Sequence, residues 1–264
     1  MTSGFATIAG SVLAAYIFMG INPQALISSC VMSIPASLAI SKLRYPETEE
    51  PLTAGRIVIP KADEDEERPT NALHAFANGG WLGLKVAGMI VASLLCILSL
   101  LAVVNAVLTW WGHYLNIGSF DPEEKHNLTI EFVLGYLFYP VSFLLGVDRE
   151  GDDILLVSKL IGMKIITNEF VAFSQLTSSA DYADLSPRSR LIATYALCGF
   201  GNISSVGIQI GVLSQLAPGK GGRVAKVAMS ALFSGIVSTL TSASIAGMLV
   251  SDQATLFKVA DAAA

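Results

Sequence analysis

Long stretches without charged residues alternate with short polar segments along this chain, and this alternation predicts several membrane spans. The first stretch runs from Met1 to Ser41 without a charged side chain. As a single helix it would be about 60 Å long, roughly twice the thickness of a bilayer's hydrocarbon core. Gly20, Asn22 and Pro23 interrupt it midway, and residues of these types commonly end helices. We therefore expect two spans, over residues 1–20 and 24–42.

Three further uncharged stretches are long enough to cross a bilayer. Residues 86–112 end near Trp110 and Trp111, and such an aromatic pair is typical of a membrane interface. Residues 191–219 and 227–250 contain no charged side chain at all. We expect one span from each of the three stretches.

Two other apolar segments carry groups that make a plain span costly. Residues 130–147 contain an acid and a central proline, Glu131 and Pro140, so we expect this segment to lie along the membrane interface. Residues 154–176 carry two lysines and the pair Asn168-Glu169. Because charged groups that face lipid are unfavourable, we expect a re-entrant hairpin lined by protein.

Basic residues indicate the orientation of these elements. Five lie in or just before the polar segment 44–80, and three lie in the turn 220–226. Since cytoplasmic loops are enriched in Lys and Arg, we assign both segments to the cytoplasm, and residues 113–129 then fall outside. The expected organisation begins with two transmembrane helices, a broken helix and the span that follows it (1–43), then a cytoplasmic loop (44–80) and a transmembrane helix (81–112). An extracellular loop with an interfacial helix (113–150), a re-entrant hairpin (151–190), two further transmembrane helices (191–251) and a C-terminal tail (252–264) complete it.

Two segments of the chain resemble each other. Gly4-Phe-Ala-Thr-Ile-Ala-Gly-Ser-Val12 matches Gly199-Phe-Gly-Asn-Ile-Ser-Ser-Val-Gly207 at Gly, Phe and Ile, with small residues elsewhere. The expected spans between them make the two copies run in opposite directions, so we interpret them as an inverted repeat. Paired spans interrupted by small and polar residues are typical of secondary transporters with discontinuous helices. The alternative is that small residues simply line helix interfaces.

Composition supports an all-α membrane protein, a polytopic helical bundle. Hydrophobic residues make up 53% of the 264 residues and charged residues only 14%, about half the share in soluble domains. The net charge of −5 and the dispersed basic residues argue against binding to nucleic acid. The three cysteines lie in apolar stretches without metal-ligand spacing, and we expect them in the core. No Ser, His and Asp arrangement indicates hydrolytic chemistry, so an enzyme is a remote alternative.

Glu169 is the strongest candidate for a functional side chain. An acid at membrane depth is costly unless it faces a cavity, a cation or polar ligand groups. An ion pair with Lys164 or Lys159 is the structural alternative. As a binding residue, the carboxylate could accept hydrogen bonds from the vicinal hydroxyls of a sugar.

The second repeat holds further candidates within one helical turn. Asn202, Ser204 and Ser205 could direct polar groups at the same ligand, and Phe200 could present its ring. Helix packing is an equally good explanation of the serines and of Phe200. In the first repeat, Thr7 and Ile8 occupy the places of Asn202 and Ile203. If the helix unwinds there, the Thr7 hydroxyl and freed carbonyls could bind a small cation, whereas in an intact helix Thr7 would bond to its own backbone.

Four segments resemble the concentrative nucleoside transporter family. They are residues 1–12 (Met-Thr-Ser-Gly-Phe-Ala-Thr-Ile-Ala-Gly-Ser-Val), 42–49 (Lys-Leu-Arg-Tyr-Pro-Glu-Thr-Glu), 168–173 (Asn-Glu-Phe-Val-Ala-Phe) and 192–208 (Ile-Ala-Thr-Tyr-Ala-Leu-Cys-Gly-Phe-Gly-Asn-Ile-Ser-Ser-Val-Gly-Ile). The resemblance extends over nearly the whole chain.

The resemblance implies cation-coupled uptake of nucleosides by a homotrimer in the plasma membrane, with a mobile transport domain that moves like an elevator. Sodium would be the coupling ion and a proton the alternative, with no other cofactor. The residues implied for the ribose and its surroundings are Glu169, Asn202, Ser205, Asn168 and Phe200. Val12 would contact the base, and Thr7 with the Ile8 carbonyl would coordinate sodium.

The sequence departs from the family in one respect. Family members carry a hairpin with a Gly-Gln-Thr-Glu-like motif before the segment that opens this chain, and the motif is absent from these 264 residues. We therefore expect the chain to be the C-terminal portion of a longer transporter. The alternative is a membrane protein that lacks half of the substrate site and does not transport.

Overall fold

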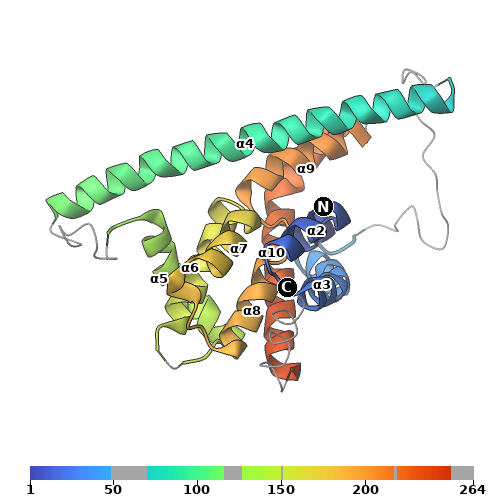
Figure 1. Ribbon diagram of the computed structural model, residues 1–264. Helices are drawn as coiled ribbons and strands as arrows, with labels where there is room; N and C mark the ends of the chain where they lie inside the picture. The colour runs from blue at the N-terminus through green and yellow to red at the C-terminus, as the bar shows by residue number, and fades with distance from the viewer. Residues whose placement is uncertain (49–69, 116–126, 150, 217–218, 251–264) are drawn as a thin grey trace.

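The computed structural model describes residues 1–48, 70–115, 127–149, 151–216 and 219–250, and every regular element within these ranges is helical (Figure 1). The elements are α1 (Thr2–Ala6), α2 (Gly10–Phe18), α3 (Pro23–Arg44), α4 (Ala72–Tyr114), α5 (Ile130–Leu145), α6 (Asp153–Ile166), α7 (Glu169–Ser178), the short 3₁₀ helix η1 (Ala180–Tyr182), α8 (Pro187–Leu197), α9 (Ile203–Leu216) and α10 (Gly221–Leu249).

Two of the described helices, α3 and α10, are by length and composition able to cross a membrane. They correspond to the spans expected over 24–42 and 227–250. The start of α3 follows from its sequence, because the Asn22 side chain accepts from the backbone N–H groups of Gln24 (2.8 Å) and Ala25 (3.3 Å). Pro23 occupies the first turn, where a missing N–H costs nothing.

The segments expected as spans over 1–20 and 191–219 are each divided into two helices, as the expectation of discontinuous helices at the two repeats requires. The first break separates α1 from α2 and includes Thr7, whose backbone is extended (φ −123°, ψ 163°). The second break separates α8 from α9 and contains Gly199 at φ +100°. A helix cannot continue through such a residue. The structure therefore has two broken helices at the positions of the two repeats.

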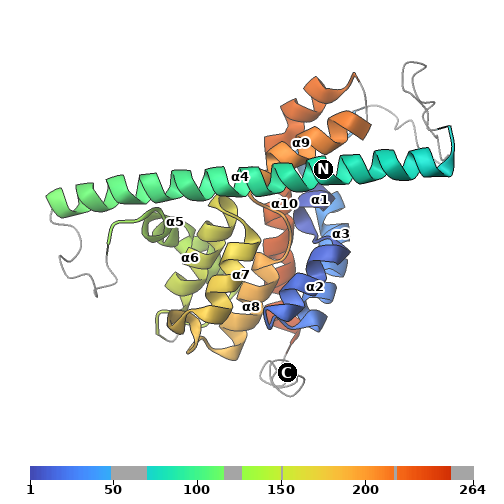
Figure 2. The ribbon, with the colours of Figure 1, turned by 45° about the horizontal axis from the view of Figure 1, so that its top comes forward.

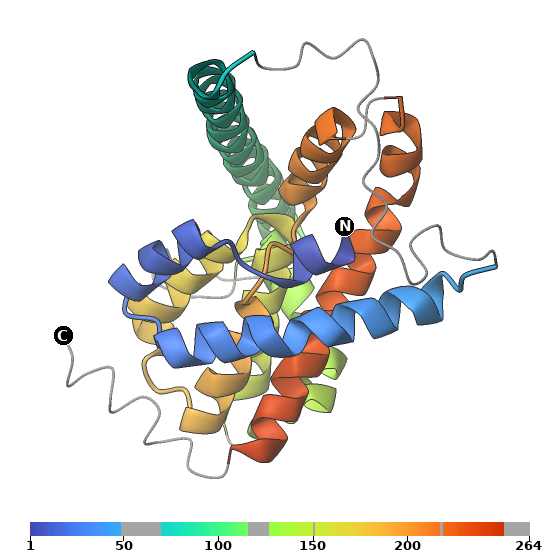
Figure 3. The ribbon, with the colours of Figure 1, turned by 90° about the vertical axis from the view of Figure 1, so that its right-hand side faces the viewer.

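Helix α4 is longer than the sequence indicates. We expected a span over 81–112 and a loop up to residue 80, but α4 begins at Ala72. Asn71 explains this start, because its side chain accepts from the His74 N–H at 2.7 Å and so caps the helix. With 43 residues, α4 is about 65 Å long. It runs along one side of the molecule and stands away from α3 and α10 (Figures 1 and 3).

A polar contact ties α4 to α5. Asn105 on α4 donates to both oxygens of Glu131, at 3.2 and 3.0 Å, and accepts from the Ile130 N–H at 2.8 Å. Thr129 caps the start of α5 by accepting from the Phe132 N–H at 3.2 Å. The Glu131 carboxylate and the N–H groups of Ile130 and Phe132 thus all have partners within the protein. The interfacial location of this segment stays a prediction.

Helices α5, α6 and α7 pack side by side (Figure 2). Close contact between α5 and α6 depends on Gly162, where an added Cβ would lie 2.6 Å from the Leu134 Cβ. The short turn Thr167-Asn168 joins α6 to α7, and the Asn168 side chain caps α7 by accepting from the Val171 N–H at 2.8 Å. The pair α6–α7 covers the segment expected as a hairpin.

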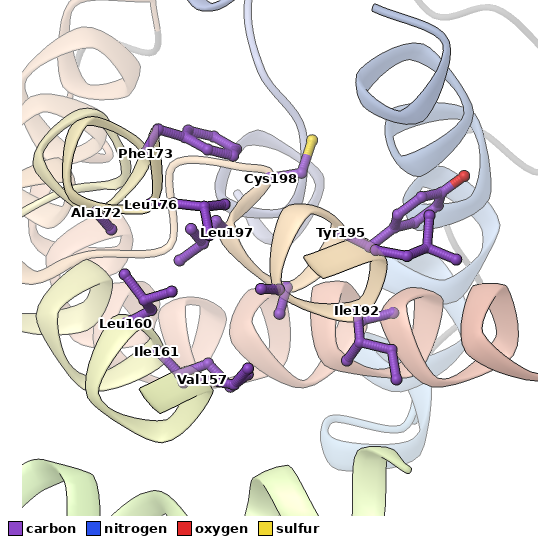
Figure 4. Packing of buried hydrophobic residues seen from close by; sticks show 14 of the residues in the cluster. Val157, Leu160, Ile161, Ala172, Phe173, Leu176, Ile192, Tyr195, Leu197 and Cys198 are labelled. Atoms are coloured by element: carbon purple, nitrogen blue, oxygen red, sulfur yellow. The ribbon is translucent and has the colours of Figure 1, made fainter. Parts of the chain in front are cut away.

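The core lies between α6, α7, α8, α3 and α10 (Figure 4). Val157, Leu160 and Ile161 from α6 face Ile192 and Leu197 of α8 (Figure 4). Small polar residues join α3 to α10: Ser33 Oγ lies 3.1 Å from Ser242 Oγ, and Ser238 Oγ donates to the Ser33 carbonyl at 3.0 Å. Such close-packed small residues are typical of helix interfaces in membrane proteins.

The expectation that all three cysteines lie in the core holds for one of them. Cys198 is buried, Cys30 is half-buried with its Sγ 3.7 Å from that of Cys198, and Cys96 on α4 is exposed. Cys96 is exposed because α4 stands away from the bundle and presents apolar side chains along most of its length.

Candidate functional site

A cavity of about 570 Å³ lies between the first break, the turn of the α6–α7 pair and the second break. Its volume is in the range of pockets that hold small organic ligands. Helices α2, α7 and α9 supply most of its walls. The lining residues are Ala9, Val12, Tyr16, Asn168, Glu169, Phe170, Phe200, Asn202, Ser204, Ser205, Ile208 and Gln209.

Glu169 stands at the start of α7 with only 5% of its surface exposed. Both of its carboxylate oxygens accept a hydrogen bond: Oε1 from the Tyr16 hydroxyl at 3.1 Å and Oε2 from Asn202 Nδ2 at 2.8 Å. Each oxygen has a second lone pair and can accept another donor. A ligand hydroxyl in the cavity can therefore bind a carboxylate whose position is already fixed.

The ion pair between Glu169 and Lys164, which the sequence left open, is not what the structure shows. The Lys164 ammonium donates instead to the carbonyl oxygens of Ala196 at 2.8 Å and Cys198 at 3.1 Å. Among the described residues, neither Lys164 nor Lys159 forms an ion pair with the Glu169 carboxylate. Glu169 is thus compensated by hydrogen bonds rather than by a direct partner cation.

Asn202 connects the carboxylate to the start of α9. Its Oδ1 accepts from the Ser205 N–H at 2.8 Å, the Ser205 hydroxyl at 2.9 Å and the Ser204 hydroxyl at 2.7 Å. This is the geometry of a helix N-cap, which leaves Nδ2 free to donate to Glu169. The N-terminal ends of α7 and α9 both meet at the cavity, and their partial positive charge stabilises a carboxylate there.

The sequence reasoning missed Tyr16, although it lines the cavity and binds Glu169. The Tyr16 side chain is fully buried, and its ring lies 5.0 Å from that of Phe173 and 6.4 Å from that of Phe170 between centroids. A signal was available, because Tyr16 follows Val12 by one helical turn and so shares its helix face. Val12 and Phe200, both expected near a ligand, form part of the apolar wall of the cavity.

Thr7 and Ile8 lie at the first break, outside the lining of the cavity. The helix is interrupted there, as cation binding by freed carbonyls requires. The Thr7 hydroxyl, however, donates to the Ser3 carbonyl at 2.9 Å, which is the local backbone contact that the sequence left as the alternative. The helix is therefore broken, as the first interpretation requires, and Thr7 bonds to its own backbone, as the alternative requires, while cation binding by Thr7 and Ile8 stays a prediction.

The two breaks contact each other. A Cβ added to Gly199 would lie 2.8 Å from the carbonyl carbon and oxygen of Ala6 and 2.9 Å from the Phe5 oxygen. The second break thus lies directly against the end of α1. This contact brings Asn202 and Phe200 to the same cavity as Val12 and Tyr16.

Comparison with known proteins gives a consistent result. The profile described as "Na+ dependent nucleoside transporter C-terminus" matches residues 25–247. Solute carrier family 28 member 3 from Mus musculus is 40% identical over 262 residues, which cover 94% of this chain and 35% of that protein. Sodium/nucleoside cotransporter 1 from Oryctolagus cuniculus is 36% identical over 264 residues, with 94% of this chain and 38% of that protein covered.

Solved structures agree with the sequence matches. A single-residue variant of CNTnw in the intermediate 2 state has a TM-score of 0.76 and 35% identity, and the match covers 94% of this chain and 57% of that one. CNTnw in an inward-facing substrate-bound state gives a TM-score of 0.73 at 34% identity, covering 98% and 56%. The chain thus spans little more than a third of the curated relatives and over half of these structures. The relatives are transporters, not enzymes.

Proposed function

The chain belongs to the concentrative nucleoside transporter family and corresponds to its C-terminal region, and we propose that it carries part of the substrate site of a cation-coupled nucleoside symporter. The observation that supports this most is the buried Glu169 carboxylate, held by Tyr16 and Asn202 at the wall of a cavity. A fixed carboxylate with free lone pairs suits the recognition of a sugar that carries two adjacent hydroxyl groups.

The ligand is a nucleoside in this proposal, with its ribose at the polar wall. Glu169 accepts from the ribose hydroxyls, and Asn202, Ser205 and Asn168 provide the surrounding polar groups. Phe200 and Val12 form the apolar wall against which the base packs. The cavity volume of about 570 Å³ is compatible with a ligand of this size.

The coupling ion belongs to the first break in this proposal. Thr7 and the Ile8 carbonyl coordinate sodium, with a proton as the alternative coupling ion. The break between α1 and α2 supports this assignment, because backbone groups outside a helix are free to bind a cation. For this role the Thr7 hydroxyl keeps its bond to Ser3 and uses an oxygen lone pair for the ion.

The whole protein is proposed to work as an elevator-type transporter with inverted repeats, α6–α7 forming a re-entrant hairpin. Each repeat has a broken helix followed by a long one, α1–α2 with α3 and α8–α9 with α10. We further propose a homotrimer in the plasma membrane. The apolar side chains that α4 exposes, among them Trp81, Leu95 and Val103, suit contact with lipid and with neighbouring subunits.

Uptake by the full-length protein in cells that lack nucleoside transport tests the proposal. Glu169→Gln removes the charge but keeps the shape of the side chain, so we expect uridine uptake to fall by about tenfold to a hundredfold. Asp184→Asn, at an exposed position away from the cavity, is the matched control and should transport normally. Undiminished uptake by Glu169→Gln, with equal amounts of protein at the membrane, would refute the site.

A further inference from the structure

Lys164 is a buried cation that the proposed substrate site leaves without a role. It is the C-terminal lysine of α6, its side chain is 2% exposed, and the ammonium donates to the Ala196 and Cys198 carbonyls at 2.8 and 3.1 Å. These two carbonyls belong to the end of α8, where the helix breaks. Figure 4 shows Leu197 and Cys198 at this end of α8 within the core.

The position of the ammonium matches the charge of the helix end. The last carbonyls of a helix have no partner in the helix and carry partial negative charge. In an aqueous loop, water would satisfy them, but here they are buried. Lys164 supplies both the hydrogen bonds and the positive charge that these carbonyls require.

Helices α6 and α7 therefore bind the two helix ends that border the second break, the end of α8 and the start of α9. Lys164, near the end of α6, binds the carbonyls at the end of α8. Glu169, at the start of α7, binds Asn202, which caps the start of α9. The Lys164 ammonium thus lies at the C-terminal end of α8, which carries partial negative charge, and the Glu169 carboxylate lies at the N-terminal end of α9, which carries partial positive charge. Both arrangements are electrostatically favourable.

At the first break, the carbonyls of the helix end have a different kind of partner. Among the described residues, no lysine or arginine donates to the carbonyls of α1, and the Ser3 carbonyl accepts from the Thr7 hydroxyl instead. Both halves thus contain a helix that ends in the interior of the protein, but the groups that bind the carbonyls at the helix end differ between them. In the described part of the chain, the second break has a cation on a side chain of the protein and the first break does not.

We propose that the Lys164 ammonium is a tethered cation: it occupies at the second break the kind of position that a free coupling ion takes at the first. The comparison with a coupling ion at the first break rests on the proposed function. The assignment of the Lys164 ammonium to the carbonyls of α8 does not. Lys164 is a positioning residue, because it holds the end of α8 and, through the short segment 198–202, the place of Asn202 beside Glu169.

The test is whether a free cation of the same chemistry can replace the side chain. Lys164→Met keeps the length of the side chain, removes the ammonium and leaves the two carbonyls without a donor. Methylammonium is small enough to bind there, whereas tetramethylammonium has no N–H and is too large. The melting temperature of the purified full-length protein is measured with each salt at equal concentration. Lys226→Met, at an exposed position of α10, is the matched control.

We expect Lys164→Met to melt about 5 °C or more below the unaltered protein and Lys226→Met to be unchanged. Methylammonium should raise the melting temperature of Lys164→Met by about 2–4 °C, with no effect of tetramethylammonium and none of either salt on the other two proteins. Equal melting of Lys164→Met and the unaltered protein, or equal effects of the two salts, would overturn the proposal.

If Lys164→Met does not accumulate in cells, growth with methylammonium is the same test in another form. The proposal expects accumulation to be restored by methylammonium and not by tetramethylammonium. Absence of the variant under both conditions would overturn it. None of these measurements uses a nucleoside, so a failure of the cation site and a failure of the proposed transport function give different results.

Discussion

Tyr16 and Asn202 approach the Glu169 carboxylate from opposite halves of the chain, one from α2 and the other from the segment before α9. The Tyr16 ring also packs against Phe173 at 5.0 Å between centroids. The phenol thus has two separable parts, a ring that fills the core and a hydroxyl that fixes one carboxylate oxygen. A substitution by phenylalanine can remove the hydroxyl and keep the ring.

Tyr16→Phe should weaken nucleoside binding while it leaves the fold intact. A hydrogen bond to a charged group is worth about 1.5–3 kcal/mol, so we expect the KM for uridine to rise by roughly tenfold or more. The melting temperature should change by only a few degrees, since the ring contacts remain. Tyr136→Phe on the exposed side of α5 is the control. An unchanged KM in Tyr16→Phe would show that Asn202 alone positions the carboxylate.

The residues that bind each other at the site were predicted unequally well. Glu169 and Asn202 were identified because polar and charged groups are costly at membrane depth, and the structure joins them at 2.8 Å. Tyr16 was not identified as a site residue, because a tyrosine in an apolar helix is also compatible with several structural roles. The bonds of Lys164 to the α8 carbonyls could not be predicted, since they depend on where α6 lies relative to α8.

At the scale of the elements, the second break depends on Gly199. Its φ of +100° is unfavourable for any residue with a Cβ, and an added Cβ would lie 2.8 Å from the Ala6 backbone. Gly199→Ala should therefore cost about 2–4 kcal/mol and lower the melting temperature of the protein by about 5–10 °C.

Gly207→Ala is the matched control for this substitution. Gly207 lies within α9 with open space around the position of a Cβ, and alanine favours a helix over glycine by about 1 kcal/mol. We expect the control to melt at the same temperature as the unaltered protein or slightly higher. Equal melting temperatures of the two variants, measured by thermal unfolding in detergent, would contradict the account of the break.

The elements were predictable where the chain carries local signals. Asn22 and Pro23 begin α3, and the sequence placed the span after them. The break between α1 and α2 could be expected only as one of two alternatives, because Thr7 to Ala9 contains no proline and the segment is also compatible with a continuous helix. The N-terminal extension of α4 was missed because Gly79 and Gly80 suggest a loop, whereas Asn71 caps a helix that continues through them.

At the scale of the whole molecule, α4 stands out because it has few contacts with the other described helices for its length. Asn105 and Glu131 fix it to α5, and it also contacts α9, but most of its apolar side chains are exposed. If α4 contacts neighbouring subunits, native mass spectrometry of the full-length protein should give the mass of three chains. A single chain under conditions that preserve transport would contradict the homotrimer.

Equilibrium binding of radiolabelled uridine to the purified full-length protein tests the central claim most directly, because it examines the cavity without the transport cycle. We predict saturable binding in sodium chloride, much weaker binding when choline replaces sodium at constant pH, and loss of binding in Glu169→Gln. Uridine binding that is the same in sodium and choline, is independent of pH and survives Glu169→Gln would contradict a cation-coupled nucleoside site at this cavity.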